Sequence, residues 1–383
     1  MKPLVLITGG AGFIGSHTAE ALLEAGYRVR VLDCLDPQIY GAGSGFPSYL
    51  NKNIDCVYGD VRNFDDVIAA LAGVSYLFHF ASLTGVGQSM YDLRNYIDTN
   101  VSGTATLIEA IIKSRLSINR FILSSSRAVY GEGTCKCRNC GIIYPPIRKR
   151  SDLELGKFYI SCPRCMKQTT SIPTEEDRPL DPNSIYGWTK KLQEELCRYA
   201  ADSFGLPVVI LRYFNVYGSR QSLKNPYTGI VSIFLNRMVS GKSVSMYEHG
   251  TPLRDFVHVS DVVNANLSAM SQDLPIGTAL NVGSGKASSI QDIITALSKA
   301  TGQEATIQDH GEFRIGDIHA CIASTSRIKN LLNYEAKITL ESGIREFVEW
   351  AKTQDIPDDS YQKTVDELKA VGLFGSTQSG IPS

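Results

Sequence analysis

The stretch LVLITGGAGFIG, residues 4–15, decides which fold the sequence predicts. Its apolar opening is typical of a buried strand, and its glycines lead into an amphipathic helical pattern over residues 14–25. A second apolar, β-branched run follows at residues 28–33. Strand, glycine turn, helix and strand in this order predict a βαβ unit with two parallel strands.

The same alternation continues along the chain. Strands are expected at residues 54–58, 76–80, 120–124 and 208–212, and helices at residues 64–71, 96–114 and 186–204. Short apolar strands that alternate with helices predict an α/β fold, a Rossmann-type doubly wound parallel sheet covered on both faces. We therefore expect a Rossmann domain over residues 1–212, interrupted at residues 134–173 by an insertion rich in Cys, Pro, Lys and Arg.

The remaining chain has a looser order of elements. Helical patterns occur near residues 229–240, 260–270, 288–300 and 341–352. We expect residues 213–353 to form mainly a smaller, substrate-binding lobe, with part of this segment returning to the Rossmann domain. Residues 354–383 are expected to hold a C-terminal helix and a flexible tail, because the chain from Gly375 onward is rich in Gly, Ser and Pro.

Composition excludes several classes of protein. With 43% hydrophobic and 20% charged residues, the 383-residue chain can bury a core and is not disordered throughout. Its net charge of −1 lacks the basic excess that nucleic acids or anionic membranes attract, and the run at residues 148–150 is expected on a solvated face. Neither a bilayer-spanning apolar stretch nor a signal-peptide pattern is present, so we expect a cytoplasmic protein without nucleic-acid or membrane partners.

The glycine turn predicts a dinucleotide site. Gly9, Gly12 and Gly15 lie between strand and helix, where a pyrophosphate must approach backbone N–H groups that side chains would block. Asp33 closes the second strand; its carboxylate can accept hydrogen bonds from a ribose hydroxyl and would repel a 2′-phosphate, which favours NAD over NADP. Asp60 could contact the adenine or be an ordinary loop residue.

A second group of residues carries acid–base chemistry. Residues 124–126, all serine, end a strand, and Tyr186 and Lys190 lie one helical turn apart on the same face. An ammonium beside a phenol favours the phenolate, as does a positively charged nicotinamide ring, so Tyr186 is a candidate base. A serine hydroxyl can bridge the tyrosine and a substrate hydroxyl.

The insertion carries a candidate metal site. The pairs Cys137-x₂-Cys140 and Cys162-x₂-Cys165 are separated by 21 residues, and Cys135 lies nearby. Two such pairs predict a closed, tetrahedral site of four cysteine thiolates for a structural zinc ion, although Cys135 could replace one of the four. Whether the insertion borders the active site or binds a partner stays open.

Taken together, these motifs resemble the extended short-chain dehydrogenase/reductase family over residues 3–350. The resemblance also includes HFA at 79–81, Asn100, RYFNVYG at 212–218 and RDFVHV at 254–259. It implies a catalytic set of Ser126, Tyr186 and Lys190. It implies NAD contacts from Gly9, Gly12, Phe13, Ile14, Gly15, Asp33, Asp60, Val61, Ala81, Asn100, Ser124, Tyr186 and Lys190. It implies that Ser126, Asn215, Arg254, Asn281, Arg314 and Asp317 bind a nucleotide-sugar substrate.

The resemblance also bears on the reaction. In this family, 4,6-dehydratases carry an acidic pair after the catalytic serine or threonine and decarboxylases carry a glutamate there, whereas this chain has Arg127 and Ala128. Simple epimerisation at carbon 4, through transient oxidation to the 4-keto sugar, is therefore expected. GVGQSMY at 85–91, NPYTG at 225–229 and the cysteine insertion resemble the dTDP-L-rhamnose 4-epimerase branch, which implies a nucleotide-linked 6-deoxyhexose (dTDP-L-rhamnose or dTDP-6-deoxy-L-talose) as substrate.

Alternatives remain open at this point. Another nucleotide-sugar epimerase, of the UDP-glucose or UDP-uronate type, or a 4,6-dehydratase would share most of these motifs. A non-catalytic NAD-binding regulatory protein would have no need of Ser126, Tyr186 and Lys190 together. The resemblance also implies a homodimer through a four-helix interface built from the helices near 96–114 and 186–204, unless both helices are fully covered within one chain.

Overall fold

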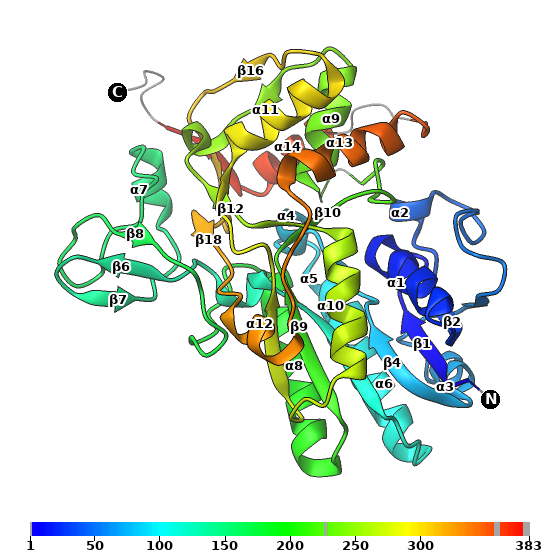
Figure 1. The fold of residues 1–383 in the computed structure, drawn as a ribbon. Coiled ribbons are helices and arrows are strands. Elements are labelled where there is room, and N and C mark those ends of the chain that lie inside the picture. The colour runs from blue at the N-terminus through cyan, green and yellow to red at the C-terminus, as the bar shows by residue number, and fades with distance from the viewer. Residues whose placement is uncertain (1, 226, 228, 356–360, 378–383) are drawn as a thin grey trace.

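The computed structural model describes residues 2–225, 227, 229–355 and 361–377. A sheet of seven parallel strands forms its centre (Figure 1). In spatial order the strands are β14 (Thr278–Val282), β9 (Val208–Tyr213), β5 (Arg120–Ser126), β4 (Val74–His79), β1 (Leu4–Thr8), β2 (Arg28–Asp33) and β3 (Asp55–Tyr58). The order reverses between β1 and β4, as expected for a doubly wound sheet.

Alternate residues of β1 explain why helices cover both faces. Val5 and Ile7 belong to one buried cluster and Leu4 and Leu6 to another on the opposite face, because successive side chains of a strand point to opposite sides. The helices that contribute to the first cluster are α1 (Phe13–Glu24), α10 (Val259–Ser271) and α12 (Ser326–Leu332). Those of the second are α3 (Phe64–Leu71), α6 (Gly103–Lys113) and α8 (Ile185–Phe204). The predicted Rossmann-type sheet is therefore confirmed.

The helix expected at residues 96–114 is composite. It begins as α5 (Leu93–Tyr96), widens into a π-helical segment over Ile97–Ser102 and continues as α6. Asn100 lies in the wide segment, and its side chain accepts a hydrogen bond from Leu83 N (2.8 Å) and donates to Thr189 Oγ1 (2.9 Å). A π segment of this kind is common at functional sites, and hydrophobic periodicity alone does not predict it.

A smaller lobe lies above the carboxyl ends of the strands (Figure 1). Its helices α9 (Ile230–Val239), α11 (Ile290–Thr301) and α13 (Leu340–Ala351) share one apolar cluster. Its short strands are β10 (Asn215–Tyr217), β11 (Val244–Ser245), β12 (Leu253–Arg254), β13 (Phe256–His258), β15 (Ser288–Ser289), β16 (Ile307–Gln308), β17 (Glu312–Arg314) and β18 (Ala320–Cys321). The chain leaves this lobe twice, first for α10 and β14, which joins the edge of the main sheet, and later for α12, which packs on that sheet.

The insertion projects to one side of the molecule (Figure 1). It consists of β6 (Cys135–Cys137), β7 (Gly141–Ile143), α7 (Arg150–Glu154) and β8 (Thr170–Ser171), whose strands pair as an antiparallel sheet. Its ends are joined, since Thr134 N donates to Thr174 Oγ1 at 3.0 Å and Ile172 N to Thr134 O at 2.9 Å.

The C-terminal segment differs in part from expectation. The expected helix is present as α14 (Tyr361–Ala370), and β19 (Phe374–Ser376) then pairs antiparallel with β17. The prediction of a flexible tail from Gly375 is thus wrong for Gly375 and Ser376, because backbone pairing holds this glycine-containing stretch against Phe313. Residues 378–383 lie outside the described part of the chain.

Two small helices, α2 (Pro37–Tyr40) and α4 (Val86–Ser89), follow β2 and β4 in the chain, and short 3₁₀ segments occur at Arg127–Tyr130 and Tyr247–Gly250. Among the described helices, none is both long and apolar enough to cross a membrane.

Candidate active site and cysteine cluster

One large cavity of about 910 Å³ lies over the carboxyl ends of the strands, beside the point where strand order reverses. It extends from the β1–α1 turn, past the end of β5, to Arg254 and Arg314 of the smaller lobe. Ligands of doubly wound sheets bind at this position, and the volume is at the upper end of the usual range for ligand cavities.

The glycine turn forms the first end of the cavity. Gly9 has φ = +67°, and a Cβ atom there would lie 2.7 Å from Ala81 N, so only glycine fits. A Cβ on Gly15 would lie 2.5 Å from Gly9 O. Gly12 precedes α1 without a side-chain cap, so the first N–H groups of the helix remain for a ligand. The predicted Gly9, Gly12, Phe13, Ile14 and Gly15 all line the cavity.

Carboxylates flank this turn. Asp33 ends β2, lines the cavity and accepts hydrogen bonds from Ala11 N (3.0 Å) and Leu35 N (2.9 Å). Burial raises the pKa of Asp33, and these hydrogen bonds act against that rise. Asp60 and Val61 also line the cavity, and for Asp60 the hydrogen bonds from Arg62 outweigh burial and lower its pKa. This end of the cavity therefore offers a helix N-terminus and two carboxylates.

The proposed catalytic residues meet at the middle of the cavity, which Ser124, Ser126, Tyr186 and Lys190 line together. Ser184 caps helix α8 by accepting a hydrogen bond from Gly187 N at 3.1 Å, which fixes the turn that carries Tyr186. The Lys190 ammonium donates to the carbonyl of Ser124 at 3.0 Å. Burial lowers the pKa of Lys190 to about 7, so its charge is sensitive to pH near neutrality.

Arg127 supplies positive charge near Tyr186. Burial raises the pKa of the Tyr186 phenol, whereas a hydrogen bond with Ser126 and the charge of Arg127 lower it. The sequence interpretation gave the charge effect to Lys190, whose Nζ instead binds the Ser124 carbonyl. The sequence predicts Arg127 as a residue that replaces a dehydratase carboxylate. Its effect on Tyr186 has no local sequence signal, because that effect depends on how β5 and α8 pack.

The far end of the cavity is rich in cationic and amide groups. Asn215, Arg254, Arg314 and Asp317 all line it, as predicted for a substrate site. Arg314 pairs with Asp317 at 2.7 Å. The Arg254 guanidinium donates to the carbonyls of Leu253, Ile318 and His319, and burial followed by the charge of Arg127 lowers its pKa to about 10. Such donors suit a diphosphate.

Two of the predicted ligand contacts, Asn281 and Asn100, lie outside the cavity lining. Asn281 is fully buried outside the cavity lining, where its side chain accepts from Tyr130 and donates to the Thr174 carbonyl. Asn100 is equally buried and holds the backbone of Leu83, which itself lines the cavity. Every polar atom of these two amides has a protein partner, and the predicted contacts of Asn100 with NAD and of Asn281 with the substrate stay predictions. Ala81, the remaining predicted NAD contact, lines the cavity.

Residues 85–91 and 225–229, the two segments that resemble the dTDP-L-rhamnose 4-epimerase branch, each contribute a tyrosine that contacts the same carboxylate. The sequence did not predict this contact. Tyr91 of the 85–91 segment and Tyr227 of the 225–229 segment both donate to Glu367 Oε2, at 2.8 and 2.7 Å. Tyr227 lines the cavity. No local pattern predicts this contact, because Glu367 lies in α14, at least 140 residues away in sequence.

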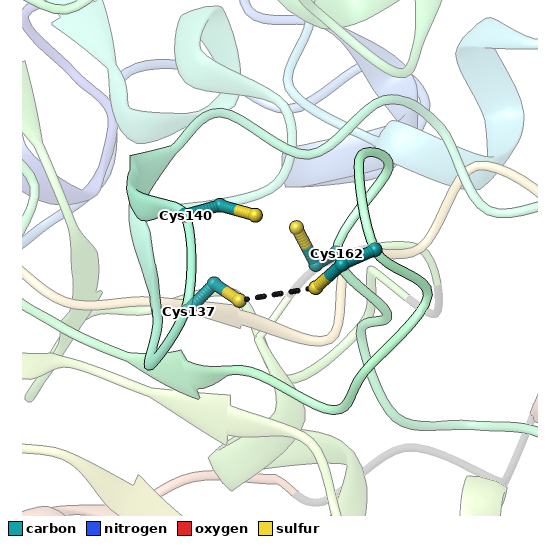
Figure 2. A group of neighbouring side chains, drawn as sticks. Cys137, Cys140 and Cys162 are labelled. Carbon is teal, nitrogen blue, oxygen red and sulfur yellow. Dashed lines mark hydrogen bonds between the residues drawn. The ribbon is translucent and has the colours of Figure 1, made fainter.

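The cysteine cluster lies within the insertion. The sulfur atoms of Cys137, Cys140, Cys162 and Cys165 all lie within 4.8 Å of one another, and Figure 2 shows the labelled side chains directed toward each other. Cys135 is outside this group, with its sulfur 4.0 Å from Ser171 Oγ. Burial raises the pKa of Cys162, but N–H groups of Arg164 and Cys165 outweigh it and bring that pKa to about 7.

The sequence profile of the NAD dependent epimerase/dehydratase family matches residues 5–283, more than half of the chain. The chain belongs to this family. Family membership confirms the resemblance inferred from the motifs and agrees with NAD as the cofactor. A dTDP-L-rhamnose 4-epimerase from Burkholderia thailandensis is 35% identical over 349 residues, which cover 90% of this chain and 94% of that relative.

Solved members of the family have the same fold. UDP-glucose 4-epimerase from Thermotoga maritima, in a structure with UDP-glucose, has a TM-score of 0.73 at 30% sequence identity. The match covers 91% of this chain and 98% of the T. maritima chain. UDP-glucuronic acid 4-epimerase from Bacillus cereus, in complex with UDP-glucuronic acid and NAD, has a TM-score of 0.75 at 28% identity, with 91% and 99% covered.

The position of Tyr186 yields a direct test. Tyr186→Phe removes the phenolic oxygen but keeps the ring, so turnover should fall by roughly 10²–10⁴, the usual scale of acid–base catalysis, while NAD binding is retained. Steady-state kinetics and NAD titration would measure both. Tyr58→Phe, at an exposed tyrosine that lies neither in the cavity lining nor on the two helices of the expected interface, is the control. Near-normal turnover of Tyr186→Phe would remove this residue from the mechanism.

Proposed function

We propose that this chain epimerises carbon 4 of a nucleotide-linked 6-deoxyhexose, of the dTDP-L-rhamnose or dTDP-6-deoxy-L-talose type. The observation that carries the proposal is the position of Ser126 and Tyr186 midway along one cavity, between a glycine turn and a cluster of arginines. A dinucleotide and a nucleotide sugar entering from opposite ends would meet at these two side chains. The substrate class is supported by the relative from B. thailandensis and by the 85–91 and 225–229 segments.

The glycine end of the cavity fits NAD. Side chains at Gly9 and Gly15 would collide with backbone, and the uncapped start of α1 suits a pyrophosphate. Asp33, together with Asp60 and Val61, would receive the adenosine part. When bound, NAD supplies a hydride acceptor and a positively charged ring at the centre of the cavity.

The chain's own residues then manage the proton. Tyr186, as phenolate, takes the proton of the substrate's 4-hydroxyl, and Ser126 bridges the phenol and the sugar. Arg127 lowers the pKa of Tyr186, and Lys190 lines the cavity and binds the carbonyl of Ser124. Return of the proton from Tyr186 to the 4-oxygen completes epimerisation after the keto sugar has presented its other face.

The absence of acidic groups beside Ser126 limits the chemistry to this step. The next two residues are Arg127, whose Nε donates to Asn215 Oδ1 at 2.8 Å, and Ala128. Neither can remove a proton from carbon 5, which a 4,6-dehydratase must do. Asp317, at the arginine end, is paired with Arg314. The substrate diphosphate would be held by Arg254 and Arg314 with help from Asn215.

The cysteine cluster is proposed as a structural zinc site. Tetrahedral zinc with Zn–S bonds of about 2.3 Å places sulfurs roughly 3.8 Å apart, and Cys137 and Cys165 already lie 3.5 Å apart. Four thiolates fill all coordination positions, so zinc here would hold the insertion together and leave no position for substrate.

A homodimer is proposed from the surface of two helices. Ile97, Trp188, Leu192 and Tyr199 are 40–65% exposed on the helices expected to form the interface. Apolar groups gathered in this way are typical of an interaction surface, and a self-complementary patch closes as a two-fold dimer.

Isotope labelling tests the proposed reaction. dTDP-L-rhamnose deuterated at carbon 4 should keep its label through inversion, because the hydrogen taken from carbon 4 returns to the same carbon. In heavy water, no solvent deuterium should enter at carbon 5. NMR of the products measures both, with UDP-glucose as the comparison substrate. Solvent label on carbon 5 would contradict the mechanism, and faster inversion of UDP-glucose would contradict the substrate class.

Metal analysis tests the cysteine site. Purified protein should contain about one zinc ion per chain, since four thiolates complete a tetrahedral shell. Cys162→Ser should lower zinc content while NAD binding persists. Cys135→Ser, a buried neighbour outside the cluster, should keep its zinc. Equal zinc loss in both variants, or freshly prepared protein without zinc, would argue against the assignment.

Light scattering tests the assembly. Protein at micromolar concentration should have about twice the 41.9 kDa mass of one chain. Leu192→Glu should shift the mass toward that of a single chain, because it places a charge in the proposed interface. Leu155→Glu, at an exposed leucine of the insertion, serves as the control. A wild-type mass equal to that of one chain would show that these helix faces are not used between chains.

A further inference from the structure

The insertion does not line the cavity, yet it packs directly behind the strand that does. None of residues 134–173 is part of the cavity lining. Phe313, the middle residue of β17, is fully buried in a cluster with Leu153 and Phe158 of the insertion. Side chains alternate along a strand, so the next residue, Arg314, faces the other way and lines the cavity. The insertion therefore packs against β17, the strand that carries Arg314, a candidate substrate ligand. We call this contact of Phe313 with Leu153 and Phe158 the seat of β17.

A buried arginine adds a polar contact to this seat. Arg148 belongs to the run expected on a solvated face, but its side chain is only 7% exposed, so that expectation is wrong for this residue. Its guanidinium pairs with Glu132 (3.0 Å) and Glu248 (2.5 Å). Lys149 is exposed, as expected. The burial of Arg148 is possible because two carboxylates from outside the insertion neutralise it.

The same guanidinium reaches the substrate end of the cavity. Arg148 donates to the carbonyl of Asp317 at 3.0 Å, and the Asp317 carboxylate pairs with Arg314. Glu132 in turn accepts the N–H of His319 at 2.7 Å. On the opposite side, Arg254 donates to the carbonyls of Ile318 and His319. The segment 317–319 is thus held between an arginine of the insertion and an arginine of the cavity.

We propose that Arg148 is a positioning residue for nucleotide-sugar binding, and that closure of the cysteine cluster is what holds it in place. Arg148 would act by fixing the backbone of Asp317, and thereby Arg314, without touching the substrate itself. The inference rests on the proposed function, because it takes Arg314 and Asp317 as ligands of the nucleotide sugar.

The cysteine cluster restrains Arg148 because the two cysteine pairs lie at either end of the loop that carries this arginine. Arg148, Leu153 and Phe158 all belong to residues 141–161, the loop between Cys140 and Cys162. Drawing the four sulfurs together fixes both ends of this loop and reduces the conformational freedom that docking would otherwise remove. Opening the cluster should therefore loosen Arg148 and the seat of β17 together, while the glycine turn and Asp33, at the other end of the cavity, stay as they are.

Binding measurements on an Arg148 variant test this. Arg148→Met keeps the length of the stem and removes all donors, and Lys149→Met is the matched control next to it. The dissociation constant for dTDP, measured by calorimetry with UDP in parallel, should rise roughly 3- to 30-fold in Arg148→Met. It should not change in Lys149→Met. In both variants NAD affinity and zinc content should match the wild type. In Arg148→Met the loss in kcat/KM should lie mainly in KM.

A second variant guards against misfolding, because Arg148→Met leaves two buried carboxylates unpaired. The triple variant Arg148→Met, Glu132→Gln, Glu248→Gln removes these charges with their partner and should show the same weakening for dTDP with NAD binding intact. Unchanged dTDP affinity in either folded variant, or equal losses for dTDP and NAD in the triple variant, would overturn the proposal.

Metal removal tests the link to the cluster. Chelation of the wild-type protein should raise the dTDP dissociation constant by a similar factor, whereas chelation of Arg148→Met should add little, because the same contact is already lost. Full additivity of the two effects would overturn the link. Because dTDP and UDP binding are both measured without turnover, failure of the epimerase assignment shows in the labelling experiment and failure of this inference shows in binding. Wild-type protein that binds neither nucleotide would also overturn the inference.

Discussion

The close approach of the β1–α1 turn to the end of β4 is the contact on which the rest of the site depends. Gly9 lies so near Ala81 that a single methyl group would force the two backbones apart. This approach brings a helix N-terminus to the point where strand order reverses, and β5 then places Ser124 and Ser126 next to it. Because all seven strands are parallel, their carboxyl ends share one edge, and the glycine turn, Asp33 and the serines at the end of β5 meet there.

Local patterns predicted the parts of the molecule whose chemistry is local. The glycine turn, the strand-end position of Asp33 and the one-turn spacing of Tyr186 and Lys190 each follow from a few neighbouring residues, and the structure brings all of them to one cavity. The strands and helices of the sheet were predicted for the same reason, since each strand is continuously apolar and each helix has one apolar face.

Features that depend on distant partners escaped prediction. Asn100 and Asn281 stand at positions suited to ligands, but backbone groups from other segments occupy their amides. The burial of Arg148 could not be predicted, because the carboxylates that pair with it, Glu132 and Glu248, lie 16 and 100 residues away in the sequence. The strand β19 has one apolar residue, Phe374, followed by Gly375 and Ser376, and its partner β17 lies far away in the sequence. In each case the conformation is stabilised by a contact between residues far apart in the sequence, and local sequence patterns do not predict such contacts.

Because the ends of the insertion are joined, its length adds little to the entropy that is lost when β5 and β9 pair. The connection between β5 and β9 runs over residues 127–207, and the insertion at 134–173 makes up about half of it. Because loop-closure entropy grows only logarithmically, doubling a flexible connection raises the free energy of pairing these strands by about 0.6 kcal/mol. The hydrogen bonds from Thr134 N to Thr174 Oγ1 and from Ile172 N to Thr134 O hold the two ends of the insertion together and so shorten the connection further. An insertion of this length between two segments that line the cavity therefore raises the free energy of strand pairing only slightly, and the ion pairs of Arg148 with Glu132 and Glu248 attach it to the rest of the chain.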